Sequence, residues 1–173
     1  MTPPPDRPSL NKPPAKNDSR SPSRLDLFNA LENILWFWPE LFIHSAEIGE
    51  PERARMTLSR SVRLTGTHEG TVIIQATPEL GTLMAKNLLQ AEDPGPYAED
   101  AFTEFVNMFC GHLMNKIRDI NKVSFRHFLP LSLPKERWPS APADSTLTVG
   151  MGEHLLQIDL WLAEGPLSPK DPS

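Results

Sequence analysis

The spacing of hydrophobic residues changes several times along the chain, and each change predicts a secondary-structure element. Spacing of three and four residues, which is typical of helices, occurs over residues 25–38, 78–90 and 97–120. Ser23 is placed to cap the first of these helices, and Thr77 followed by Pro78 opens the second. Alternation of hydrophobic and polar residues, which is typical of strands, occurs over residues 56–74, 123–128 and 147–162.

The first and last alternating segments each contain a turn signal, so both are predicted to be hairpins. The turns are expected at residues 68–70 and near residues 150–153, where glycines occur. Hairpins mixed with helices, with few long crossovers between strands, are typical of an α+β fold. We therefore expect an antiparallel sheet that is covered by helices on one face.

The ends of the chain differ in composition from its middle. Residues 1–24 contain seven prolines and five cationic side chains against two Asp, and Leu10 is their only large aliphatic residue. Such a segment cannot bury enough apolar surface to offset the entropy cost of ordering it. We expect a disordered basic tail over residues 1–24, a folded domain over 25–163 and a flexible tail over 164–173.

Charge and cysteine content narrow the classes of protein that need consideration. The formal charge of −5 divides into +3 for the tail and −8 for residues 25–173, which argues against nucleic-acid binding. A single cysteine, Cys110, and the lack of a signal-like start predict a cytoplasmic protein. The longest apolar stretch ends at Pro39 and is too short to span a membrane.

The predicted helix over residues 97–120 has two different sides when its residues are placed 100° apart. Its hydrophobic side, expected to face the core, contains Phe102, Phe105, Val106, Phe109, Leu113, Ile117 and Ile120. The opposite side carries a polar stripe of Asp100, Glu104, Asn107 and Gly111, which must face water or a partner. Met108 and Met114 flank this stripe, and flexible apolar side chains beside polar ones suit a docking surface.

The stripe resembles a known signature. Asp100-x3-Glu104-x2-Asn107, followed by 22 residues and Pro130, is similar to the motif of the CheC/CheX/FliY family of bacterial chemotaxis phosphatases. The run from Glu104 to Gly111 resembles CheX most. The resemblance implies a CheC-like fold with one catalytic site, as in CheX, because the first helix has Glu32 and Asn33 adjacent and lacks the second site of CheC.

The resemblance also implies a function. The expected substrate is the aspartyl phosphate of a CheY-like response regulator, with Glu104 and Asn107 as catalytic residues and Asp100, Met108, Gly111 and Met114 as partner-binding residues. Asn107 would orient the attacking water without the repulsion of a second carboxylate, and Glu104 would pair with a lysine of the regulator. The protein would need no cofactor or metal of its own, because the regulator supplies Mg²⁺.

Several alternatives stay open at this stage. A binding module of the same fold, as in flagellar switch proteins, would recognise a regulator or an assembly partner without hydrolysis. Gly111 suits either the close approach of a partner or packing against a neighbouring element, and the family proline is either Pro130 or Pro134. A homodimer is expected, because the strand region 147–162 would leave an unpaired apolar edge that pairing with a second copy covers.

Other phosphatase and metal chemistries lack their sequence signals. Cys110 is followed six positions later by Lys116 and not by the Arg that cysteine-dependent phosphatases require. The five histidines are scattered without metal-ligand spacing, and neither a Gly-x-Ser-x-Gly elbow nor a Gly-x4-Gly-Lys loop is present.

Overall fold

The computed structural model of the chain describes residues 22–38, 41–46, 49–66, 68–90, 93–121 and 125–164. The helices are α1 (Arg24–Leu35), α2 (Glu50–Arg55), α3 (Pro78–Leu89) and α4 (Ala98–Asn121), with short 3-10 helices η1 (Gly95–Tyr97) and η2 (Lys135–Arg137). The strands are β1 (Ile43–Ser45), β2 (Leu58–Gly66), β3 (His68–Ala76), β4 (Phe125–His127), β5 (Ser145–Met151) and β6 (His154–Glu164).

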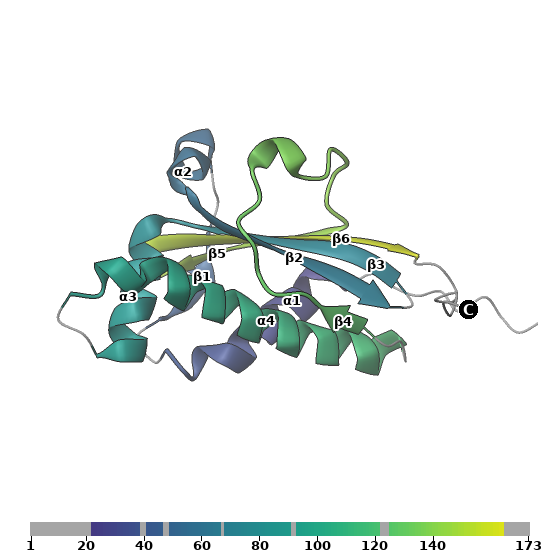
Figure 1. Cartoon of the computed structure of the whole chain (residues 1–173), viewed down its shortest axis with the longest axis horizontal. Helices are drawn as coiled ribbons and strands as arrows, with labels where there is room; N and C mark the ends of the chain where they lie inside the picture. The colour runs from purple at the N-terminus through teal and green to yellow at the C-terminus, as the bar shows by residue number, and fades with distance from the viewer. Residues whose placement is uncertain are drawn as a thin grey trace, which may run out of the picture.

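The strands form one antiparallel sheet in the order β1-β5-β6-β3-β2-β4. Helices α1, α3 and α4 lie against one face of this sheet, whereas α2 and the loop that carries η2 stand over the other face (Figure 1). The predicted α+β fold, with an antiparallel sheet covered by helices on one face, is confirmed.

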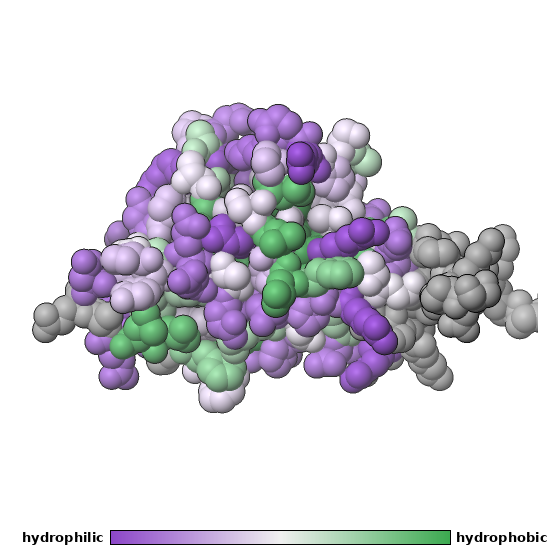
Figure 2. All heavy atoms as spheres, viewed as in Figure 1, coloured by the Kyte–Doolittle hydropathy of each residue, from purple (hydrophilic) through white to green (hydrophobic). Residues whose placement is uncertain are grey.

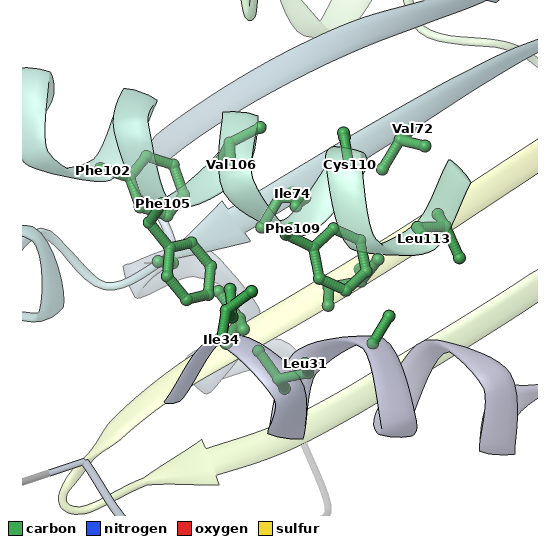
Figure 3. Close-up of a cluster of buried hydrophobic side chains, with 14 of the residues drawn as sticks. Leu31, Ile34, Val72, Ile74, Phe102, Phe105, Val106, Phe109, Cys110 and Leu113 are labelled. Carbon is green, nitrogen blue, oxygen red and sulfur yellow. The ribbon is translucent and has the colours of Figure 1, made fainter. Parts of the chain in front are cut away.

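The core lies between the helix layer and the sheet. The hydrophobic side of α4 meets α1 and the middle strands here, and Figure 3 shows Phe105 and Phe109 of α4 beside Leu31 and Ile34 of α1. The predicted core residues of α4 from Phe102 to Ile117 are all buried, while the side chain of Ile120 lies outside the described residues. Burying this side of α4 leaves its polar stripe on the outside.

The first hairpin turns earlier than the sequence suggested. The prediction of a turn at residues 68–70 is wrong, because β3 begins at His68 and all three residues pair with β6. Gly70 is needed for the close approach of the strands, since a Cβ added there would lie 2.6 Å from the carbonyl oxygen of Trp161. The sequence reading also did not include the short elements β1 and α2.

The folded part begins slightly before the predicted boundary at residue 25. The side chain of Ser23 accepts a hydrogen bond from the Asp26 backbone N–H, and Asp26 accepts one from the Ser23 backbone N–H, so the two form a capping box for α1. Pro22 is buried, and its carbonyl oxygen accepts a hydrogen bond from Ser145 of β5. Residues 1–21 and 165–173, which hold the remainder of the two predicted tails, lie outside the described residues.

The last hairpin forms as predicted but does not lie at the edge of the sheet. Strand β6 pairs with β3 on one side and β5 on the other, and β5 pairs with both β1 and β6. The expectation that residues 147–162 leave an unpaired edge is therefore wrong. The outer strands are β1 and β4. The homodimer stays a prediction and needs another surface than the one first expected.

Candidate active site

The polar stripe of α4 lies on the outer side of the helix. Asp100 and Glu104 are exposed, and Asn107 and Gly111 are half-buried. Asp100, Glu104, Asn107 and Gly111 follow one another at spacings of four, three and four residues, so their side chains share one face of the helix. The stripe is therefore available to a partner along about three turns of α4.

The two methionines beside the stripe differ from each other. Met108 is half-buried and packs against the core with part of its surface, as expected of a residue that flanks an exposed stripe. Met114 is only 7% exposed and belongs to the core cluster. The expectation that Met114 contributes to a docking surface is wrong, because the apolar side of α4 is wider than the sequence reading assumed.

Gly111 does not pack against another element. A Cβ added at this position would have no described heavy atom within 4 Å, the helix's own nearby backbone and chain neighbours aside. Of the two readings left open by the sequence, packing against a neighbouring element is therefore not supported. The open space beside Gly111 is compatible with the approach of a partner.

A buried arginine of β2 holds the start of α4. Arg60 donates hydrogen bonds through Nε to Thr103 Oγ1 at 2.8 Å and through Nη2 to Glu99 Oε2 at 2.9 Å. Its third nitrogen, Nη1, donates to the Ser59 carbonyl oxygen at 2.9 Å, and Nη2 also donates to the Glu99 carbonyl oxygen at 3.5 Å. The Arg60 side chain is 10% exposed, whereas that of Glu99 is 75% exposed. These contacts fix the helical turn that leads into Glu104.

A histidine from the sheet edge contacts Asn107. His127, the last residue of β4, has its Nε2 atom 3.3 Å from Asn107 Oδ1. Strand β4 reaches this position because it pairs with the end of β2, with His127 opposite Leu64. The contact therefore joins the candidate catalytic amide of the helix layer to the edge strand of the sheet.

The chain continues from β4 along the edge of β2. The Phe128 N–H donates to the Arg63 carbonyl oxygen at 3.0 Å, and Leu131 exchanges backbone hydrogen bonds with Ser61. Pro130 lies between these attachments and is buried, whereas Pro134 is exposed at the start of η2. Pro130 is thus the proline that lies in the strand-like segment directly after His127.

This segment carries exposed apolar side chains. Phe128, Leu129 and Leu131 are 53%, 76% and 65% exposed. In Figure 2 hydrophobic atoms gather in the middle of the visible face, where the segment between β4 and η2 runs in Figure 1. An apolar ridge beside a polar stripe is typical of an interaction surface.

The carboxylates of the stripe are free of ion pairs with other described residues. In the described part of the chain no ion pair involves Asp100 or Glu104, so both carboxylates can meet a cation from outside. Across the same residues no group of three or more His, Cys, Asp and Glu side chains could hold a metal ion. Burial raises the pKa of the Cys110 thiol far above its ordinary value, which makes this cysteine a poor nucleophile.

Sequence reasoning missed His127 and Arg60. The alternation Leu58-x-Arg60-x-Val62 already places Arg60 on the core side of β2, so this signal was available. The contact of His127 with Asn107 depends on the pairing of β4 with β2, a register that no local pattern reveals.

The α+β fold, with its antiparallel sheet and helix layer, is similar to that of solved CheX and CheC-like proteins. CheX from Desulfovibrio desulfuricans superposes on this chain with a TM-score of 0.59 at 15% sequence identity. The alignment covers 80% of this chain and 97% of that CheX chain. A CheC-like protein from Shewanella oneidensis has a TM-score of 0.60 at 18% sequence identity. That alignment covers 80% of this chain and 95% of the CheC-like chain. A chain of the CheX-CheY-BeF3-Mg²⁺ complex from Borrelia burgdorferi has a TM-score of 0.64 at 15% sequence identity. The alignment covers 84% of this chain and 100% of the matched chain.

Likeness at such identities shows the fold alone, and a match in sequence is a separate observation. Residues 58–135 match the family model described as chemotaxis phosphatase CheX, a span that includes α4, His127 and Pro130. The resemblance to CheX-like chemotaxis proteins is thus confirmed. A search of curated proteins finds no match to the chain. Within the described residues no helix has the length and hydrophobicity to cross a membrane.

Proposed function

We propose that this protein hydrolyses the aspartyl phosphate of a CheY-like response regulator, with Glu104 and Asn107 as its catalytic residues. The observation that carries the proposal is their position, one turn apart on the outer side of α4, in a chain whose residues 58–135 match the CheX family. The relative from Borrelia burgdorferi, which is a complex with CheY, supports the choice of partner.

The reaction needs a water molecule placed in line with the phosphorus atom. The water oxygen attacks phosphorus, the bond from phosphorus to the acyl oxygen breaks, and the regulator's aspartate leaves as a carboxylate with the electron pair. The proton released by the water ends on the phosphate. Because an acyl phosphate already has a good leaving group, positioning of the water supplies most of the catalysis.

Asn107 is suited to orient this water. A neutral amide both donates and accepts hydrogen bonds, so it can hold the water without the repulsion that a carboxylate would bring near a phosphoryl group. Asn107 is half-buried on the outer side of α4, one turn from the exposed Glu104, and this position supports its access to a partner's site. Removing an orienting group of this kind is expected to slow hydrolysis by about a hundred- to a thousandfold.

Glu104 is suited to set the docking position. Its side chain is exposed, and among the described residues no cation pairs with it, so a lysine of the regulator can do so. Asp100, Met108 and Gly111 complete the proposed contact surface. The divalent metal comes with the regulator in this proposal, in keeping with the Mg²⁺ of the Borrelia burgdorferi complex.

The experiment follows phosphate release from phosphorylated receiver domains of the source organism, with and without the purified protein. Wild type is expected to accelerate release from at least one receiver, and Asn107→Ala is expected to lower the rate at saturating receiver while binding survives. Glu104→Ala is expected to weaken binding as well, with a salt dependence in the wild type. Glu32→Ala, the same change at an exposed position of α1, is the matched control.

The outcome separates hydrolysis from mere binding. Unchanged turnover in Asn107→Ala contradicts the mechanism. A wild-type protein that binds a phosphorylated receiver without accelerating phosphate loss contradicts the enzymatic proposal and supports the non-catalytic binding module instead.

A further inference from the structure

We infer that His127 is a positioning residue that holds the Asn107 amide in the orientation needed to place the attacking water. The inference rests on the proposed function and adds to it a residue from outside the helical motif. It is carried by the contact of 3.3 Å between His127 Nε2 and Asn107 Oδ1 and by the attachment of His127 to the sheet.

The direction of this hydrogen bond follows from the chemistry of the two groups. An amide oxygen only accepts, so the proton lies on His127 Nε2 and the histidine is the donor. Among the described residues this is the only hydrogen bond made by the Asn107 side chain. A surface asparagine without such a contact would rotate among its rotamers and turn its amide over.

The contact leaves the catalytic capacity of the amide intact. Oδ1 has a second lone pair that can accept a hydrogen bond from the water, and both Nδ2 protons stay available to the water or to phosphoryl oxygens. The hydrogen bond from His127 to Oδ1 also fixes the amide so that its oxygen, and not its nitrogen, points toward β4. Asn107 is thereby set before the regulator arrives, which reduces the entropy cost of reaching the reactive geometry.

While β4 is paired, His127 is attached to the neighbouring strand. It is half-buried and lies opposite Leu64 of β2. The next residue, Phe128, donates its backbone N–H to the Arg63 carbonyl oxygen. A donor carried by a paired strand holds its partner more firmly than one on a free loop. The sheet edge thus supports a side chain that projects from the helix layer.

The test compares two replacements that differ in donor capacity. His127→Phe keeps a ring but removes the donor, and it is expected to lower kcat by about ten- to a hundredfold with little change in KM for the phosphorylated receiver. His127→Gln keeps an N–H donor and is expected to recover most of the rate. His154→Phe, the same change in a half-buried histidine of β6, is the control and should leave kcat unchanged.

A double substitution separates positioning from a general structural effect. If His127 acts only through Asn107, adding His127→Phe to Asn107→Ala has no further effect on kcat. Proton–nitrogen NMR at pH 8 gives a readout that does not depend on activity. The Nε2–H proton of His127 should exchange slowly with water in wild type, because it is hydrogen-bonded to Asn107, and faster in Asn107→Ala.

Each result decides between the inference and the proposal beneath it. An active wild type whose His127→Phe variant is equally active overturns this inference alone, as does an NMR signal of His127 that does not respond to Asn107→Ala. Additive rate losses in the double variant overturn it too. A wild type that releases no phosphate from any receiver overturns the proposed function, and the inference with it.

Discussion

Replacing Arg60 with methionine tests how strongly the sheet holds the start of α4. Methionine keeps an unbranched apolar chain in the space of the arginine stem but removes every donor. The variant loses the hydrogen bonds to Thr103 Oγ1, to Glu99 Oε2 and to the Ser59 carbonyl oxygen. Because the bond to Thr103 also fixes the residue before Glu104, the variant should loosen the helical turn that carries the candidate site.

The expected change in the free energy of unfolding is modest, because the variant loses hydrogen bonds but no longer buries a charged group. These three short hydrogen bonds at about 1 kcal/mol each give a loss of about 3 kcal/mol. A fourth bond, from Nη2 to the Glu99 carbonyl oxygen, is 3.5 Å long and adds little. The bond to Glu99 counts for less, since that carboxylate is 75% exposed and is well hydrated without its partner. Relief of the cost of burying a guanidinium returns about 1 kcal/mol or more. Arg60→Met should therefore lower the free energy of unfolding by about 1–2 kcal/mol.

Two further variants show which part of the arginine contributes to the free energy of unfolding. Arg60→Ala also removes the apolar stem beyond Cβ, which in arginine is two methylenes at about 0.8 kcal/mol each, and should cost about 1.6 kcal/mol more than Arg60→Met. Arg63→Met, which changes an exposed arginine of the same strand, should cost no more than about 0.5 kcal/mol.

Urea unfolding monitored by circular dichroism measures these differences as midpoint shifts at constant slope. An Arg60→Met variant as stable as wild type would refute the reasoning, because the buried guanidinium would then contribute nothing net.

Four further variants test other parts of the structure. Gly111→Ala should raise the free energy of unfolding by about 0.5–1 kcal/mol, because the new Cβ meets nothing; calorimetry checks this, and weaker regulator binding in the same variant would indicate close approach of a partner. Cys110 has a raised pKa in the folded state, so the folded state binds the thiol proton longer than the unfolded state does as pH rises. Stability should therefore fall above about pH 9, by at most about 1.4 kcal/mol per pH unit from this group, and the loss should be smaller in Cys110→Ala; equal slopes in urea titrations of both proteins would contradict this. Ser23→Ala should cost about 1 kcal/mol through loss of the cap of α1, whereas deletion of residues 1–21 should leave the melting temperature unchanged; a large fall on deletion would show that the tail had been misread.

The sequence revealed those features that depend on local periodicity. The stripe of Asp100, Glu104, Asn107 and Gly111 could be predicted because a long helix with one buried side has only one place for them. Met114 was misplaced because the helix packs against α1, α3 and the sheet together, which widens its buried side. Short elements such as β1 and α2 carry too few residues for a periodic signal.

Features that depend on pairing between distant segments could not be predicted. The register of β4 against β2 brings His127 to Asn107, although 20 residues separate the two in sequence. Gly70 is similar, because its role depends on the backbone of β6, about 90 residues further along the chain. Sequence reasoning therefore found the catalytic candidates but not the residues that hold them in place.

The position of His127 on β4 makes the site depend on a part of the fold that opens easily. Strand β4 pairs over only three residues, Phe125–His127, and lies at the edge of the sheet. Short edge strands detach in local fluctuations that cost far less free energy than global unfolding. Each such opening would carry His127 away from Asn107 while the core stays folded. Activity should therefore decline at urea concentrations below the midpoint of global unfolding, so that fraying of the sheet edge, and not melting of the domain, limits the conditions under which the site works.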